Sequence, residues 1–387
     1  KEIVVNGEYP AGHTLILGKT GTGKTVTVAA LLSFAERFNP FIFAMDKDKG
    51  LEIFIRAIGG TYFALDAGVP TGLNPFQWPD SPRLRDFLYD LVGSCVRQGH
   101  KENTAEETKQ IQMAVDTVMN LDFQYRRMGA LLHSIPPSPE ENSLLTRLEI
   151  WCGKGRFGWC FDNPSNLFNP DEFFRVGFDL TDILKTNYRP TEPLLACLFY
   201  MKNIMLDRVA KTRSALFTVV EEFWLPASYP TTARFILDGL KTDRKLGGLL
   251  VLPTQSPKDA INSPIFDTVV EQTVTKILLP NPAAEYEGNY SRIGLTEKEF
   301  REMARLGEKS RTFLVKQNMG SSLAKLNLQG MDEEIAVLSG NAANVHIMHE
   351  AMKSCGSEKP DDWLPVFQQM RREAHTRQKK AESLPTA

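Results

Sequence analysis

Residues 18–25 read Gly-Lys-Thr-Gly-Thr-Gly-Lys-Thr, which fits the phosphate-loop pattern G-x-x-x-x-G-K-T. An apolar stretch at 14–17 comes directly before this motif and is typical of a buried parallel strand. After the motif, apolar residues from Val26 to Phe38 recur at helical spacing. Because a phosphate loop forms where a strand, a glycine-rich turn and a helix follow one another, the sequence predicts an α/β fold built around such a loop.

The predicted loop would close around a polyphosphate. Its glycines let backbone N–H groups approach phosphate oxygens at the start of a helix, which already favours anions. Lys24 is expected to reach the β- and γ-phosphates, and the Thr25 hydroxyl is expected to ligate Mg²⁺. The sequence therefore predicts binding of a nucleoside triphosphate together with Mg²⁺. The residues expected to contact the nucleotide are Gly18, Thr20, Gly21, Thr22, Gly23, Lys24 and Thr25.

Alternating strand and helix patterns in 1–80 and 171–340 predict one mostly parallel, doubly wound sheet. Residues 81–170 between them show helical spacing and little alternation, which predicts an all-α insertion. Residues 341–387 predict a helical tail. The expected strands are 14–17, 41–45, 61–65, 174–180, 215–220, 249–253 and 274–279, with an edge hairpin at 311–316 and 324–328. Helices between the strands are expected at 51–58, 193–209 and 231–241.

The tail carries an apolar stripe at Trp363, Val366, Phe367 and Met370, which predicts a terminal helix with one narrow buried face. Basic residues follow this stripe. The pattern fits a helix that docks on its own domain, and it also fits docking on a partner or an anionic surface.

The composition excludes several classes of protein. The 45 basic and 47 acidic residues give a net charge of −2, so the chain as a whole has no pull toward nucleic acid or anionic lipid. Its five cysteines form no C-x-x-C pair, which is typical of reduced thiols in the cytosol. No apolar run reaches the roughly 18 residues of a transmembrane segment. Because the chain opens Lys1-Glu2-Ile3 without an initiator Met, we expect a fragment or a processed product.

A second motif supplies carboxylates to the predicted phosphate site. The buried strand 215–220 is followed directly by Glu221 and Glu222. Side chains at the carboxyl ends of parallel strands point into the crevice where open α/β sheets bind ligands. Glu221 is expected to hold Mg²⁺ through its water shell, and Glu222 to orient and polarise an attacking water. The alternative is a solvated acidic pair that merely closes a strand.

The next strand offers residues at both of its ends. Gln255, in Thr254-Gln255-Ser256-Pro257, is expected to sense the γ-phosphate or the lytic water, because a helix cap at this turn would not explain a Gln. Arg244 precedes the strand, so it is expected to reach a neighbour's site in a ring as an arginine finger. Arg234 and Arg292 are competitors for that role, and a surface salt bridge is the alternative.

Together the motifs at 18–25, 221–224, 244–245 and 254–257 resemble those of the large ATPases of type IV secretion and conjugation machines, the CagE/TrbE/VirB family. This family lies within the wider group of RecA-like ring pumps. The helical insertion is also similar, and the resemblance extends over residues 10–330. Glu221 departs from the family pattern, in which Asp usually stands at that position.

The resemblance implies a RecA-like P-loop core and the C-terminal ATPase domain of a longer protein, with ATP as the nucleotide. It implies ATP hydrolysis that powers pilus assembly and substrate translocation, with Lys24, Glu222, Gln255 and Arg244 as the catalytic set. It further implies a homo-oligomeric ring, a hexamer, at the cytoplasmic face of the bacterial inner membrane. Other secretion-system components would be its partners, and DNA or protein its transported substrate.

Two alternative functions use the same motifs. A RecA-like DNA-pumping translocase or coupling protein would track nucleic acid with basic loops, and this sequence has no dense Lys/Arg stripe outside 371–380. A nucleotide-dependent assembly scaffold would bind ATP with little turnover. Turnover that depends on Glu222 separates an enzyme from a scaffold, and duplex-stimulated turnover favours a DNA pump.

Overall fold

The computed structural model describes residues 12–382, except for 100, 256, 309 and 318–319, and it describes only the backbone of 378–382. Three parts of the predictions therefore lie outside the described residues. They are the first eleven residues of the predicted range 1–80, Ser256 of the sensor turn, and residues 383–387 of the predicted tail.

The described residues form one nine-stranded sheet in the order β3-β4-β2-β5-β6-β1-β7-β8-β9. Neighbouring strands are parallel from β3 through to β7, and β8 and β9 join the β7 edge in antiparallel pairs. The strands are β1 (His13–Leu17), β2 (Phe41–Asp46), β3 (Thr61–Ala64), β4 (Arg175–Asp179), β5 (Leu216–Val220), β6 (Gly248–Thr254), β7 (Thr273–Leu278), β8 (Thr312–Gln317) and β9 (Gly320–Lys325).

The predicted strands up to residue 279 are present, each within one residue of its expected ends. The last one was wrong in position: a strand was expected at 324–328, whereas β9 ends at Lys325. The reason is the hairpin register, in which Gln317 faces Gly320 and Thr312 already faces Lys325, so the first residue of β8 is paired at Lys325 and the strand pair ends there. Leu326 and Leu328 leave the sheet and pack against the core cluster around α1 instead.

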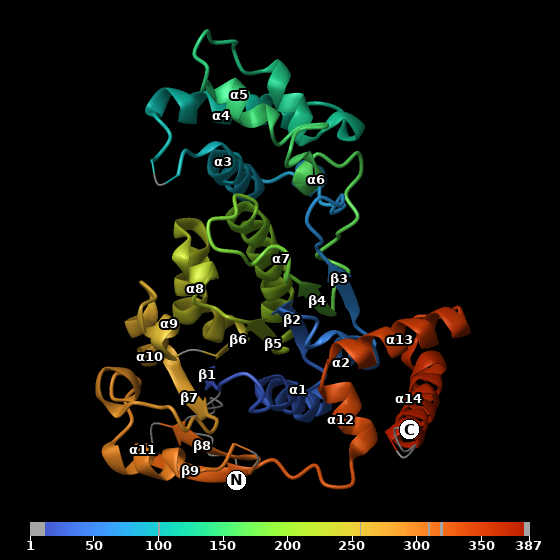
Figure 1. Cartoon of the computed structure of the whole chain (residues 1–387). Coiled ribbons are helices and arrows are strands. Elements are labelled where there is room, and N and C mark those ends of the chain that lie inside the picture. The colour runs from blue at the N-terminus through green and yellow to red at the C-terminus, as the bar shows by residue number, and fades with distance from the viewer. Residues whose placement is uncertain (1–11, 100, 256, 309, 318–319, 383–387) are drawn as a thin grey trace.

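Helices cover both faces of the sheet (Figure 1). Alternate residues of the central strands point to opposite faces, as the pleat requires. Ile16 and Ile42 pack in one cluster with α1, whereas Leu15 and Phe43 pack in the larger cluster with α7. The helices of the α1 face are α1 (Lys24–Ala35), α2 (Glu52–Ala57) and α12 (Asp332–Leu338), and those of the other face include α7 (Thr191–Thr212), α8 (Pro230–Thr242) and α10 (Phe266–Gln272).

The range 81–170 contains helices and no sheet strand among its described residues. In Figure 1 these helices stand beyond the end of α7, away from the rest of the sheet. Stacked rings of Phe87 and Tyr200, with centroids 4.3 Å apart, join this part to α7. Its helices are α3 (Pro82–Val96), α4 (Ala105–Met119), α5 (Leu144–Glu149) and α6 (Gly158–Phe161).

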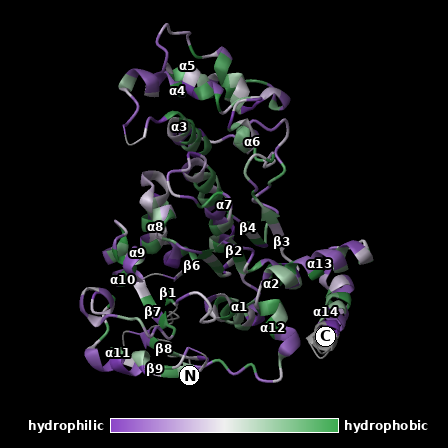
Figure 2. Ribbon diagram, in the orientation of Figure 1, coloured by the Kyte–Doolittle hydropathy of each residue, from purple (hydrophilic) through white to green (hydrophobic). Residues whose placement is uncertain are grey.

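The tail docks on its own core. It consists of α13 (Ala342–Cys355) and α14 (Pro360–Glu382), which lie beside α2 in Figure 1. Trp363 and Phe367 are fully buried and share a cluster with Ile53 of α2. In Figure 2 both helices carry apolar and polar residues, and the buried apolar ones belong to this cluster. Of the two interpretations of the stripe, docking on the chain's own domain is the one observed.

The remaining helices lie between the late strands. They are α9 (Pro257–Ile261) and α11 (Glu297–Ala304), and a short 3₁₀ helix, Asp243–Leu246, precedes β6.

Candidate functional site

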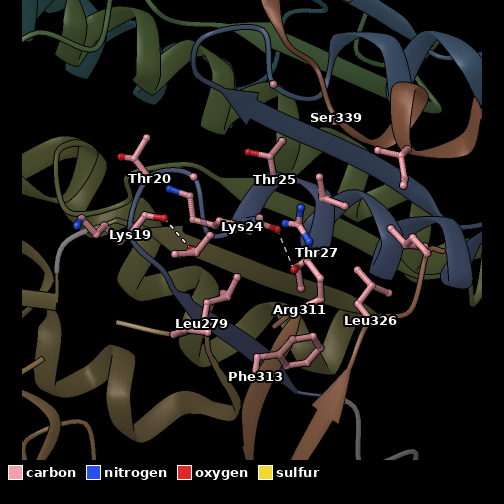
Figure 3. A pocket seen from close by; sticks show the side chains of 18 of the residues that line it. Lys19, Thr20, Lys24, Thr25, Thr27, Leu279, Arg311, Phe313, Leu326 and Ser339 are labelled. Carbon is pink, nitrogen blue, oxygen red and sulfur yellow. Dashed lines mark hydrogen bonds between the residues drawn. The ribbon is translucent and has the colours of Figure 1, made fainter. Parts of the chain in front are cut away.

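A cavity of about 830 Å³ lies where the carboxyl ends of β1, β5 and β6 meet the start of α1. Its lining includes residues 19–27 of the predicted phosphate loop, together with Glu221 and Gln255. The opposite wall comes from 310–313 and from 325–340, a part of the chain that no predicted nucleotide motif includes. Figure 3 shows the labelled side chains of both walls around this space.

The loop has the backbone that its glycines allow. Gly21 and Gly23 have φ of 83° and 95°, a left-handed conformation that residues with a Cβ rarely adopt. Gly18 donates its N–H to Thr254 O (3.1 Å), which fixes the loop to the end of β6. Among the described residues, no side chain caps the N-terminus of α1 at Gly23. The first-turn N–H groups are therefore left for a ligand, and their partial positive charge favours an anion.

Lys24 lines the cavity and contacts Glu222, although the two residues are far apart in the sequence. The Lys24 Nζ lies 2.9 Å from Glu222 Oε1, and both side chains are buried. The other carboxylate oxygen accepts from Trp224 Nε1 (2.9 Å) and from Thr254 Oγ1 (3.0 Å). Burial alone would raise the pKa of Glu222, but the Lys24 ammonium and these donors outweigh burial and hold the pKa below its ordinary value. Glu222 is therefore an ionised carboxylate with a defined orientation.

The backbone at Glu222 is unusual. Its φ is 48°, in the left-handed region, and its N–H donates to Pro253 O at 3.0 Å. A residue with a Cβ pays roughly 1–2 kcal/mol for this conformation. Such strain persists only where surrounding contacts enforce it, and it concentrates at functional sites. The turn directs the carboxylate of Glu222 back across β6 toward Lys24.

Glu221 belongs to a buried acidic pair. Its N–H donates to Met45 O (3.0 Å), which sets it beside Asp46 at the end of β2. Burial raises the pKa of the Glu221 carboxyl to about 7, against the attraction of Lys24. Burial and the neighbouring Glu221 likewise raise the pKa of Asp46, while Tyr62 Oη donates to Asp46 Oδ2 at 2.6 Å. The sequence analysis missed Asp46 and Tyr62; the one local signal was an Asp directly after the predicted strand 41–45.

Thr25, one of the predicted magnesium ligands, lies near Asp46, the partner of Glu221 in the acidic pair. A Cβ atom placed on Gly50 would lie 3.0 Å from Thr25 Cγ2 and 3.4 Å from Asp46 Oδ1, so Thr25 and the acidic pair are neighbours. The chemistry of these oxygens suits Mg²⁺, which is usually held by one or two carboxylates together with substrate phosphates. Among the described residues, no three His, Cys, Asp or Glu side chains form a metal cage of their own.

The two residues at the ends of β6 lie far apart. Gln255 reaches the loop, where its Oε1 accepts a hydrogen bond from Thr20 Oγ1. Arg244 is exposed in the 3₁₀ helix before β6. The seven residues of β6 separate it from Gln255 by roughly 20 Å, since a strand rises about 3.3 Å per residue. The structure thus brings Lys24, Glu221 and Gln255 to one cavity, with Glu222 in contact with Lys24, and leaves Arg244 outside it.

The sequence analysis also gave no role to the late residues that line the cavity. They include Arg311 and Phe313 at the start of β8, and Leu326 and Ser339 after β9. Figure 3 shows all four around the phosphate loop. Only their position in the folded chain brings them there, because β8 reaches this edge through its antiparallel pairing with β7.

No helix among the described residues has both the length and the apolar character needed to cross a bilayer.

Comparisons with known proteins agree with this architecture. No family model matches the chain. Type IV secretion system protein VirB4 of Bartonella henselae is 38% identical over 362 residues, which make up 93% of this chain and 45% of that protein. Type IV secretion system protein PtlC of Bordetella pertussis is 34% identical over 382 residues, or 95% of this chain and 46% of that protein. The chain thus spans less than half the length of these relatives.

Two solved structures share the fold. VirB4 of Thermoanaerobacter pseudethanolicus superposes with a TM-score of 0.66 at 18% identity, over 82% of this chain and 90% of that one. The plasmid coupling protein TrwB in complex with ADP and Mg²⁺ gives a TM-score of 0.58 at 15% identity, over 82% and 86%. The predicted fold class, a RecA-like P-loop core with a mostly parallel sheet, is confirmed.

Proposed function

The chain is a relative of the VirB4 proteins of type IV secretion systems, and we propose that it is the part of such a protein that hydrolyses ATP. The contact between Lys24 Nζ and Glu222 Oε1, 2.9 Å long, carries this proposal. In this contact a lysine, the residue type that binds the β- and γ-phosphates, meets a carboxylate, the residue type that activates water. A protein that only binds a nucleotide has no need of a buried, ionised carboxylate at that point.

The chain's own residues divide the reaction between them. The loop N–H groups from Gly21 to Thr25 bind the phosphates, and Lys24 turns from Glu222 toward the β- and γ-phosphates. Glu222, held by Trp224 and Thr254, then orients an attacking water and accepts its proton. Mg²⁺, held by Thr25 and Glu221 with the phosphates, would neutralise the charge that develops on them.

Gln255 and Arg244 complete the proposed reaction. Gln255 lies where it can hydrogen-bond the γ-phosphate or the water, and Thr20 orients its side chain. Arg244 is exposed and too distant for its own cavity, which suits a finger that enters the cavity of a neighbouring subunit. We therefore propose a homo-oligomeric ring, a hexamer, as the active form.

The wider setting is proposed from the relatives alone. Because VirB4 and PtlC are type IV secretion system proteins, we propose that hydrolysis powers pilus assembly and the translocation of DNA or protein. The site of action would be the cytoplasmic face of the bacterial inner membrane, together with other components of the secretion system.

Glu222→Gln tests the central proposal. The variant keeps a side chain of the same size but cannot take a proton from water. We expect turnover by the concentrated, assembled protein to fall at least about 100-fold, the size typical of a lost general base, while ADP affinity stays within a few-fold. Glu141→Gln, on an exposed loop of the helical part, is the matched control. Equal turnover in Glu222→Gln and in the unmodified protein would contradict the enzyme proposal and favour the scaffold.

A further inference from the structure

The cavity continues past the phosphate loop to a wall that the nucleotide motifs do not include. This wall consists of the start of β8, the end of β7 and the segment after β9. Its positively charged side chains are Arg311 and, at the end of β9, Lys325, and its apolar side chains include Leu279, Phe313 and Leu326. The two kinds of side chain lie next to each other in Figure 3, with Arg311 directed toward the start of α1.

Arg311 lies against the phosphate loop itself. Its Nη1 is 3.4 Å from the position that a Cβ atom on Gly23 would take. A guanidinium near the N-terminus of a helix faces the positive end of the helix dipole, which is unfavourable unless an anion lies between them. Within the part of the chain that the structure describes, the Arg311 side chain makes no hydrogen bond or ion pair, whereas Lys24 is paired with Glu222.

The backbone holds Arg311 in this position. Its φ is 57°, in the left-handed region, where residues with a Cβ are uncommon. The Arg311 carbonyl accepts a hydrogen bond from Leu326 N–H at 3.0 Å, so the strand pair fixes the turn. Strained backbone of this kind is found at ligand clamps as well as at catalytic turns.

The apolar residues beside Arg311 offer a surface for a flat ring. Leu279 is buried, while Phe313 and Leu326 are half-buried and line the cavity. Ligand sites combine apolar walls with a few polar groups that fix orientation. A phosphate chain on the loop and an aromatic base on this wall would together span the cavity.

We propose that Arg311 binds the inner phosphates of a nucleotide held by the loop, and that Leu279, Phe313 and Leu326 receive its base. The proposal rests on the proposed nucleotide binding. The loop N–H groups would donate hydrogen bonds to the α- and β-phosphates, and Lys24 would bind the β- and γ-phosphates. Because Arg311 lies beside Gly23, it adds a charge-assisted, bidentate contact to phosphates that ADP and ATP share.

Binding of ADP, of a non-hydrolysable ATP analogue and of pyrophosphate, each with Mg²⁺, tests the proposal by calorimetry. Arg311→Gln keeps a polar side chain but removes the charge. Arg311→Lys keeps the charge but removes the planar guanidinium group that makes bidentate contacts. We expect Arg311→Gln to weaken both nucleotides by about 10- to 100-fold and by the same factor, the usual range for a charge-assisted hydrogen bond, with partial recovery in Arg311→Lys. Arg301→Gln, on the exposed surface of α11, is the control and should bind as the unmodified protein does.

Leu326→Ala tests the base surface, with Phe313→Ala as a second variant and thermal melting as the check of folding. Each should weaken ADP binding several-fold and leave pyrophosphate binding unchanged. Unchanged ADP binding in Arg311→Gln, or equal losses for ADP and pyrophosphate in a folded Leu326→Ala, would overturn this inference. The proposed function fails separately, if the unmodified protein binds no nucleotide or if Lys24→Ala binds it equally well.

Discussion

Replacing Lys24 with alanine in the nucleotide-free protein leaves the Glu222 carboxylate buried without its cation. Removing one partner of a buried ion pair costs roughly 3–5 kcal/mol. Trp224 and Thr254 still donate to Glu222 Oε2, so part of the carboxylate remains satisfied. We therefore expect the free energy of unfolding at pH 8 to fall by about 2 kcal/mol, the usual loss for a buried charged group that keeps some hydrogen bonds.

The loss should depend on pH in a definite direction. The pKa of Glu222 lies below its ordinary value in the folded protein, so the ion pair stabilises the fold above the ordinary carboxyl range. That stabilisation is lost as the pH falls through the lowered pKa. In Lys24→Ala, Glu222 can instead take up a proton as the pH falls, so the difference between the two proteins should shrink toward about pH 4.

Urea unfolding without nucleotide, followed by tryptophan fluorescence at pH 8 and pH 5, measures both effects. The proteins compared are Lys24→Ala, Glu222→Gln and the double variant. If the two residues are coupled, the double variant should lose about 2 kcal/mol less free energy of unfolding than the sum of the two single losses. Lys185→Ala removes an exposed pair with Asp182 and should change stability by less than about 1 kcal/mol. Strictly additive losses, or a difference that does not vary with pH, would refute the reasoning.

Three other substitutions test the proposed ring and the docking of the tail. Arg244→Ala should lower turnover of the assembled protein by about 10³-fold or more without changing ADP affinity, as expected for an arginine finger. Arg234→Ala breaks only an exposed pair with Asp90, so a larger loss there than in Arg244→Ala would transfer the role to Arg234. Trp363→Ala should cost about 3–5 kcal/mol of stability, because it empties a fully buried site between α14 and α2. A melting temperature equal to that of the unmodified protein would contradict this docking.

The phosphate loop and the acidic strand end could be predicted because each is determined locally. Gly21 and Gly23 permit the left-handed turns, and the apolar runs before Gly18 and Glu221 form parallel strands. Carboxyl ends of parallel strands share one edge of a sheet, so the two motifs had to lie near each other. The contact between Lys24 and Glu222 follows from that rule.

Arg311 and the pairing of Asp46 with Glu221 could not be predicted in the same way. Each depends on the order of strands, which puts β2 beside β5 and β8 beside β7. Local periodicity identifies a strand but does not choose its neighbour. The end of β9 was wrong for a related reason, since the register of a hairpin fixes it and the alternation of Leu326 and Leu328 does not.

The position of β1 in the sheet has a consequence for how the chain is made on the ribosome. This strand precedes the loop, yet both of its partners come much later in the chain: Thr14 faces Val251 on one side and Thr275 on the other. More than 230 residues must therefore be synthesised before β1 gains its first neighbour, and contacts so distant in sequence form slowly. A newly made chain therefore keeps the apolar strand before the phosphate loop unpaired until β6 has been made, and an unpaired apolar strand is prone to aggregate.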